Sequence, residues 1–203
     1  MMKRIGICAL VALLLVVGSA TGVCAQEKEK SLTELAQEAI DKSKAEASVP
    51  GEQHKHLAAM AGSWTYSGKI WMDPSGPPME VTGTSEHTMI MQGRFLQQEG
   101  HSEFQGTEFA GFGLVGFNKM TNKLQSVWID NTGTAMLIMT GTCDAEGKTF
   151  TSFGEFKDLM KSDMQKIKAV TKLTGPDEMV DEMFLLMPDG KEIKTMQLNY
   201  KRK

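Results

Sequence analysis

The chain has 203 residues, which is enough for one domain with a well-buried core but too few for two ordinary domains plus an export segment. Lys and Arg total 22 against 25 Asp and Glu, a net charge of −3. This balance argues against a nucleic-acid-binding protein, which needs a basic surface to displace counterions from phosphates. Hydrophobic residues make up 41% and charged residues 23%, which argues against wholesale disorder.

The first 25 residues have the pattern of a secretory signal peptide. Lys3 and Arg4 precede an apolar run at 5–17, and Val23 and Ala25 stand at −3 and −1 of a cleavage point. The apolar run is too short for a membrane span. We therefore expect cleavage after Ala25 and a periplasmic or secreted protein.

The alternative reading of this segment is a lipoprotein anchored at Cys24. It is disfavoured because Val23 stands where a lipobox has Gly, Ala or Ser. Cleavage after Ala25 leaves Cys143 as the one cysteine of the mature chain. An internal disulfide is then excluded, so the domain must be held by its core.

Residues 26–50 are predicted to form a helical arm or linker. Ser31 and Glu34 have the spacing of a capping box, and an apolar face follows them at helical spacing. The helix is expected to fade near Ala47, because Pro50 and the glycine after it stop it. We interpret the arm as a loosely attached spacer; the alternative is that its narrow apolar face docks a partner.

From Trp64 onward the hydrophobic pattern has a period of two, and turn residues recur about every ten residues. The predicted strands are 64–72, 79–89, 94–104, 107–118, 123–130, 134–143, 148–157, 164–174, 178–187 and 191–201. Short connections make sequence neighbours antiparallel neighbours in space. Residues 51–203 are therefore expected to form an all-β, up-and-down antiparallel barrel of about ten strands, with a sandwich as the alternative.

The alternation does not settle which face of the strands is inside. In the strand at 178–187, Met179, Asp181 and Met183 alternate with Val180, Glu182 and Phe184. A barrel of this size encloses more volume than its core side chains easily fill. The sequence therefore predicts a cavity with a mixed lining, where a small ligand could bind.

Several motifs, in this order, resemble a bacterial family of exported proteins catalogued as a domain of unknown function. The motifs are Pro50–Trp64, Gly83–Glu86, Gln92–Leu96, Gly113–Asn118, Trp128–Thr134 and Pro188–Glu192. The resemblance covers about residues 50–202. It implies a barrel similar to calycins and nitrobindins.

The resemblance also implies how the barrel closes. Gly62 would let the chain enter the first strand tightly, and Trp64 would close one end and pack on Arg202 from the last strand. The nitrobindin likeness adds a haem-binding alternative. It is weakened because the expected axial histidine near the C-terminus is missing, and only His87 and His101 lie on the barrel.

Polar residues at the end of one predicted strand are candidates for binding a ligand at the barrel mouth. Trp128, Asp130 and Asn131 precede a turn that contains Gly133. Asp130 and Asn131 could instead cap that turn through backbone hydrogen bonds.

Glu86, Arg94 and His101 on two adjacent predicted strands are further tentative ligand-binding residues. A carboxylate and an imidazole paired across a hairpin could act as acid and base or as metal ligands. Glu86 and His87 alternate onto opposite faces, however, and the other reading is that these are surface residues. We expect neither a metal site nor a catalytic residue, and no cofactor.

The hypothesis from sequence is thus an exported barrel that binds a small, mostly apolar ligand and has no membrane span. The alternatives are a structural or interaction protein without a ligand, a haem protein, and an enzyme using a cavity carboxylate such as Glu86 or Asp130.

Overall fold

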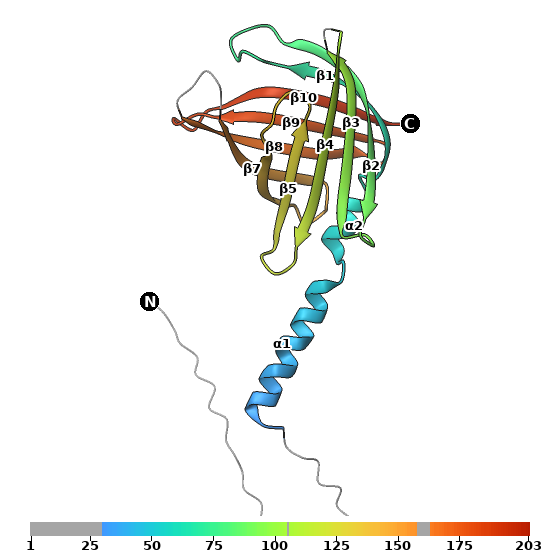
Figure 1. Ribbon diagram of the computed structural model, residues 1–203, viewed down its shortest axis with the longest axis vertical. Helices are drawn as coiled ribbons and strands as arrows, with labels where there is room; N and C mark the ends of the chain where they lie inside the picture. The colour runs from blue at the N-terminus through green and yellow to red at the C-terminus, as the bar shows by residue number, and fades with distance from the viewer. Residues whose placement is uncertain (1–29, 105, 158–162) are drawn as a thin grey trace, which may run out of the picture. The chain divides into compact units, whose positions relative to one another are not determined.

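The computed structural model describes residues 30–104, 106–157 and 163–203. The predicted signal peptide, its cleavage point after Ala25 and the alternative anchor at Cys24 lie outside the described residues. Ten strands form a closed antiparallel barrel, so the predicted fold class is confirmed (Figure 1). The strands are β1 (Gly62–Ile70), β2 (Met79–Ile90), β3 (Phe95–Phe104), β4 (Thr107–Asn118), β5 (Lys123–Asp130), β6 (Leu137–Cys143), β7 (Thr149–Lys157), β8 (Met164–Gly175), β9 (Glu178–Leu186) and β10 (Glu192–Arg202).

The pairing of β1 with β10 closes the barrel. These strands run antiparallel, with Trp64 opposite Arg202 and Ile70 opposite Met196. Every strand therefore has a partner on each side, and the sheet has no free edge. The sandwich alternative is excluded by this closure.

Strand alternation decides which side chains face the interior. On β1, Trp64 and Tyr66 are 0% and 8% exposed, whereas Thr65 and Ser67 between them are exposed. The main core lies at the end of the barrel where β1 begins. Its buried members are Leu57, Met60, Trp64, Tyr66, Val81, Leu96, Leu124, Phe150, Met179, Leu198 and Tyr200.

The short helix α2 (Glu52–Ala58) covers this end of the barrel (Figure 1). Leu57 of this helix is 0% exposed, and Met60, just after the helix, is 3% exposed. Both belong to the main core. His54 is also buried: its Nδ1 accepts a hydrogen bond from the Gly51 N–H at 3.0 Å, and its ring meets Phe117 edge to face. Helix α2 thus covers one end of the barrel.

The helix α1 (Leu32–Ser48) begins and ends close to the predicted positions. The capping box is present, with the Ser31 N–H donating to Glu34 Oε2 at 2.8 Å and the Glu34 N–H donating to Ser31 Oγ at 3.3 Å. None of its residues is buried. The chain divides into two compact units, one up to Ala39 and one from Ile40 to Lys203.

Neither helix in the described part of the chain combines the length and apolarity that crossing a membrane would need.

Candidate functional site

The barrel encloses a cavity of about 480 Å³. This volume falls in the range of small-molecule sites, which is roughly 300–1,000 Å³. Most of the wall is apolar, with Val81, Leu124, Phe150 and Leu198 among the side chains that border the space. A cavity of this kind favours an apolar occupant, since burying apolar surface is worth about 25 cal/mol per Å².

Aromatic and polar side chains gather where the cavity approaches the end that α2 covers. Tyr66, His87 and Tyr200 come from β1, β2 and β10, and all three border the cavity. The ring centroids of Tyr66 and Tyr200 are 5.3 Å apart, and those of His87 and Tyr200 are 6.2 Å apart. Three strands thus bring two hydroxyl groups and an imidazole to one region of an apolar space.

The protonation of His87 follows from its hydrogen bond. Its Nδ1 lies 3.1 Å from the carbonyl oxygen of Met60, which can only accept, so Nδ1 carries the hydrogen. Burial lowers the pKa of His87 to about 4, so the ring is neutral at neutral pH. The opposite nitrogen, Nε2, is then the hydrogen-bond acceptor of a ring that borders the cavity.

Asp181, on β9, is the polar group of the cavity that lacks a full set of partners. Hydrogen bonding from Thr171 and Tyr200 reaches the carboxyl group, but its Oδ1 is buried and has no hydrogen-bond partner in the described part of the chain. Burial raises the pKa of Asp181 to about 6, against these hydrogen bonds. Burial and the neighbouring Asp181 carboxyl also raise the pKa of Tyr200 well above its ordinary value. A buried acceptor without a donor is a position that a ligand can satisfy.

Trp128 and Asp130 border the cavity nearer its other end, on β5. The Trp128 Nε1–H donates to Asp130 Oδ2 at 3.1 Å. The other carboxylate oxygen accepts hydrogen bonds from the backbone N–H and the hydroxyl of Thr132. Asp130 therefore holds the indole ring and also caps the turn after β5, which is the turn-capping role considered for it from sequence.

Three glycines on β3 and β4 make room for the Trp128 ring. The positions at which Gly100, Gly111 and Gly113 would carry a Cβ all lie close to the indole. A methyl group on Gly111 would overlap the ring, whereas one on Gly100 would stand 3.6 Å from it, in ordinary contact. The indole thus lies flat on a backbone surface and forms part of the cavity wall.

We expect Gly111→Ala to push Trp128 out of place. The overlap should cost about 1–3 kcal/mol in the free energy of unfolding and alter the tryptophan fluorescence. Gly100→Ala is the matched control and should change both by much less. Equal effects of the two substitutions in urea unfolding would contradict the placement of the ring.

The other sequence-predicted site residues do not border the cavity. Asn131 caps the turn, accepting from the Ala110 N–H at 3.1 Å and donating to the Glu108 carbonyl at 2.9 Å. Glu86 is exposed and accepts a hydrogen bond from the Ser63 hydroxyl at 2.6 Å. His101 is exposed as well, because it alternates to the outer face of β3.

Arg94 also lies away from the cavity, in the connection between β2 and β3. Its guanidinium donates to the carbonyl oxygens of Met91 at 3.0 Å and Ser48 at 2.9 Å. Together with Lys119, which donates to the carbonyls of Glu46 and Val49, it holds the backbone at the end of α1. These contacts are structural, and cations at a helix C-terminus are also favoured by the helix dipole.

Gly62, Trp64 and Arg202 meet at the end of the barrel near α2. The guanidinium carbon of Arg202 lies 4.2 Å from the centre of the Trp64 ring. The same guanidinium donates to the carbonyls of Ala61 and Ala59, and to Asp177 Oδ1 at 3.0 Å. Gly62 has φ +138°, and a side chain there would collide with Arg202.

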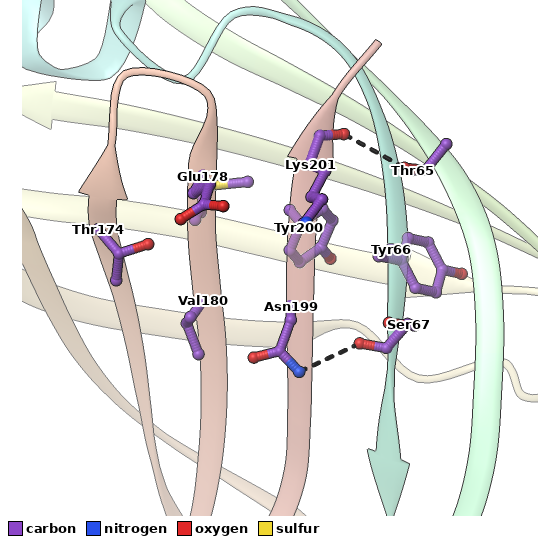
Figure 2. A pocket seen from close by; sticks show the side chains of 10 residues that line it. Thr65, Tyr66, Ser67, Thr174, Glu178, Val180, Asn199, Tyr200 and Lys201 are labelled. Atoms are coloured by element: carbon purple, nitrogen blue, oxygen red, sulfur yellow. Dashed lines mark hydrogen bonds between the residues drawn. The ribbon is translucent and has the colours of Figure 1, made fainter.

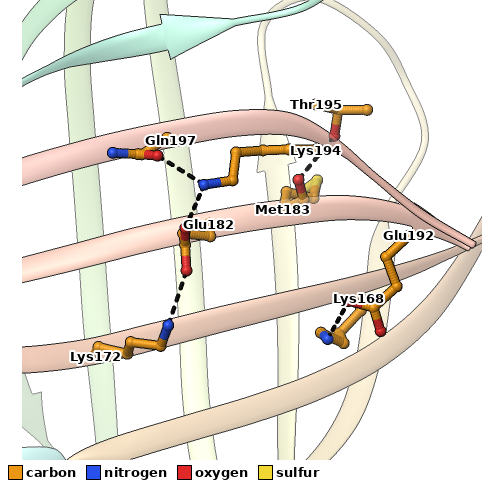
Figure 3. A network of polar contacts seen from close by, with 8 residues as sticks. All are labelled: Lys168, Lys172, Glu182, Met183, Glu192, Lys194, Thr195 and Gln197. Atoms are coloured by element: carbon orange, nitrogen blue, oxygen red, sulfur yellow. Dashed lines mark hydrogen bonds and ion pairs between the residues drawn. The ribbon is translucent and has the colours of Figure 1, made fainter. Parts of the chain in front are cut away.

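A network of ion pairs covers the outer face of β8, β9 and β10 (Figure 3). Glu182 accepts from Lys194 Nζ at 2.5 Å and from Lys172 Nζ at 3.1 Å. These two lysines lower the pKa of Glu182, whose side chain is 14% exposed. Glu182 also borders the cavity, but its charge is compensated from outside.

A second, smaller hollow of about 260 Å³ lies over β1, β8, β9 and β10 (Figure 2). Polar side chains such as Thr65, Ser67 and Asn199 line it, and Asn199 donates to the Ser67 carbonyl at 3.4 Å. These three residues are exposed, so the hollow belongs to the outer surface and lacks the enclosure of the interior cavity.

Within the described residues, the strands of the barrel offer the haem alternative a single interior histidine. His101 is on the outer face, which leaves His87 as the interior imidazole on the barrel. His87 is 4% exposed and is packed near Trp64 and Tyr200, at 6.2 Å between ring centroids in each case. Within the described residues, no group of three or more His, Cys, Asp or Glu could hold a metal ion.

Comparison with one solved structure supports the fold alone. Rv2717c from M. tuberculosis is similar with a TM-score of 0.58 and 13% identity, over 76% of this chain and 99% of that one. A redesigned β-barrel matches with a TM-score of 0.38 and 12% identity, over 73% of this chain and 95% of that one. No curated protein matches the chain. The family described as "Protein of unknown function (DUF1579)" matches residues 49–202, so the chain belongs to the DUF1579 family.

Proposed function

We propose that this barrel binds a small, mostly apolar molecule in its interior cavity. The observation that carries the proposal is an enclosed space of about 480 Å³ whose wall is mainly apolar and includes a few convergent polar groups. A barrel serving only as a rigid scaffold would gain stability by filling this space, because cavities cost free energy. From sequence alone, we also propose that the chain is exported and loses residues 1–25.

Native mass spectrometry of protein expressed with its full sequence tests both parts. We expect a bound small molecule that denaturation releases, together with a polypeptide mass that begins at Gln26. The test variant is Ala169→Phe, which fills the cavity because Ala169 borders the space. It should carry no bound molecule, whereas Thr142→Phe on an exposed position of β6 should carry it as the wild type does.

A wild-type protein without any bound mass, which also binds no apolar probe added in solution, would contradict ligand binding. That result would favour the interaction-protein alternative. Circular dichroism spectra of both variants establish that they are folded, so that loss of binding in Ala169→Phe can be assigned to the cavity.

A further inference from the structure

We propose that the ligand has an apolar body with a protonated amine at one end, and that Asp181 binds this amine inside the barrel. The inference rests on the proposed function and adds the chemical class of the ligand.

The charges that border the cavity are all negative. Asp130, Asp181 and Glu182 line it, and no Lys or Arg does so among the residues that the structure describes. A fatty acid or an organic phosphate would bring a further negative charge into this space, where water screens charges weakly. The lining thus disfavours anions and favours a cation.

Two of the three carboxylates already have partners. Asp130 accepts hydrogen bonds from Trp128 and Thr132, and Glu182 is held by two lysines on the outer face (Figure 3). Asp181 has no cation beside it, and its buried Oδ1 accepts no hydrogen bond within the described residues. The unsatisfied charge of the cavity is therefore at Asp181.

Other groups that border the cavity also suit a donor. His87 presents Nε2 as an acceptor, because its Nδ1 hydrogen is used by the Met60 carbonyl. The side chains of Tyr66 and Tyr200 border the same space, and Tyr200 hydrogen bonds to Asp181. An ammonium group has N–H donors and no acceptor, so it complements a carboxylate and neighbouring lone pairs. An alcohol offers one donor and no charge.

Calorimetric titration with three probes that share one chain tests the assignment: decylamine, decanol and decanoate, each below its aggregation concentration. At pH 7.5, we expect wild-type protein to bind decylamine about tenfold or more tightly than decanol, and decanoate more weakly than either. Binding of decanol or decanoate in preference to decylamine would overturn the amine assignment while leaving ligand binding intact. Binding of none of the three would contradict the proposed function itself.

Substitution of the carboxyl group tests the role of Asp181. Asp181→Asn keeps the shape of the side chain but removes the charge, so decylamine affinity should fall about tenfold and decanol affinity should change by less than about threefold. Glu80→Gln on the exposed face of β2 is the matched control and should bind like the wild type. An unchanged preference for the amine in Asp181→Asn would overturn the proposal.

The pH dependence gives a second readout. The titratable side chains that border the cavity are Tyr66, His87, Asp130, Asp181, Glu182 and Tyr200. Since the pKa of Asp181 is about 6, decylamine affinity should fall about tenfold between pH 7.5 and pH 5, as the carboxylate is protonated. Decanol affinity should stay nearly constant over this range. Equal pH dependence of the two probes would contradict an ionic contact with Asp181.

Discussion

Trp64→Ala is expected to lower the free energy of unfolding by about 3–5 kcal/mol. The side chain is 0% exposed, donates from Nε1 to the Met60 carbonyl at 3.0 Å, and lies under the Arg202 guanidinium. Its loss leaves a void between β1 and the residues that join α2 to the barrel. Since domains of this size have about 5–15 kcal/mol of stability, the variant should be only marginally folded.

The matched control for this prediction is Phe153→Ala on β7. Phe153 is 50% exposed, so its removal should cost less than about 1 kcal/mol. Urea unfolding followed by circular dichroism compares the two variants with the wild type. Similar losses in both would show that Trp64 is not the anchor of this end of the barrel.

Asp181→Asn should have the opposite effect on stability. The pKa of this carboxyl is raised from 3.8 to about 6, so ionisation at neutral pH costs the folded state about 2–3 kcal/mol. At pH 7 the asparagine variant should therefore be more stable than the wild type by roughly this amount. The gain should shrink as the pH falls through 6 and vanish below about pH 4.

The direction in which the unfolding free energy changes with pH follows from proton binding. Between pH 3.8 and about 6, the folded wild type holds a proton at Asp181 that the unfolded chain has released, so its stability falls as the pH rises. His87 acts in the opposite direction: its pKa is lowered to about 4, so its contribution weakens the fold as the pH falls below 6.5. The difference between wild type and Asp181→Asn cancels the His87 contribution.

Unfolding free energies measured from pH 4 to pH 8 test this prediction, with Glu80→Gln as the exposed control. A difference between wild type and Asp181→Asn that does not change with pH would show that Asp181 is not a buried carboxyl of raised pKa.

The barrel was predictable because its turns and alternation act locally. Connections rich in Gly, Pro and Asn mark each strand end, and their shortness dictates antiparallel neighbours. The strand boundaries predicted from the sequence are less accurate where side-chain hydrogen bonds lengthen a turn. The sixth strand was expected from 134 but begins at Leu137, after the turn that Asp130 and Asn131 cap. Hydrogen bonds of this kind depend on the folded chain.

The candidate site was only partly accessible from the sequence. Trp128 and Asp130 were found because they end a strand before a turn. His87, Tyr200 and Asp181 were missed as a group because they are far apart in the chain and meet only when β2, β9 and β10 close around one space. One signal was present: Asp181 alternates with Met179 and Met183, which places a carboxylate on an apolar strand face.

The pairing of β1 with β10 has a consequence for the order of events in folding. It joins residues 64–70 to 196–202, so these contacts span most of the domain, and the loop that they close is the longest in the barrel. A nascent chain that still lacks β10 leaves β1 and β9 without a partner on one side. The domain must therefore acquire its structure after synthesis of the C-terminal strand, slowly for its size, as non-local topologies do. Until then its exposed strands are a target for chaperones.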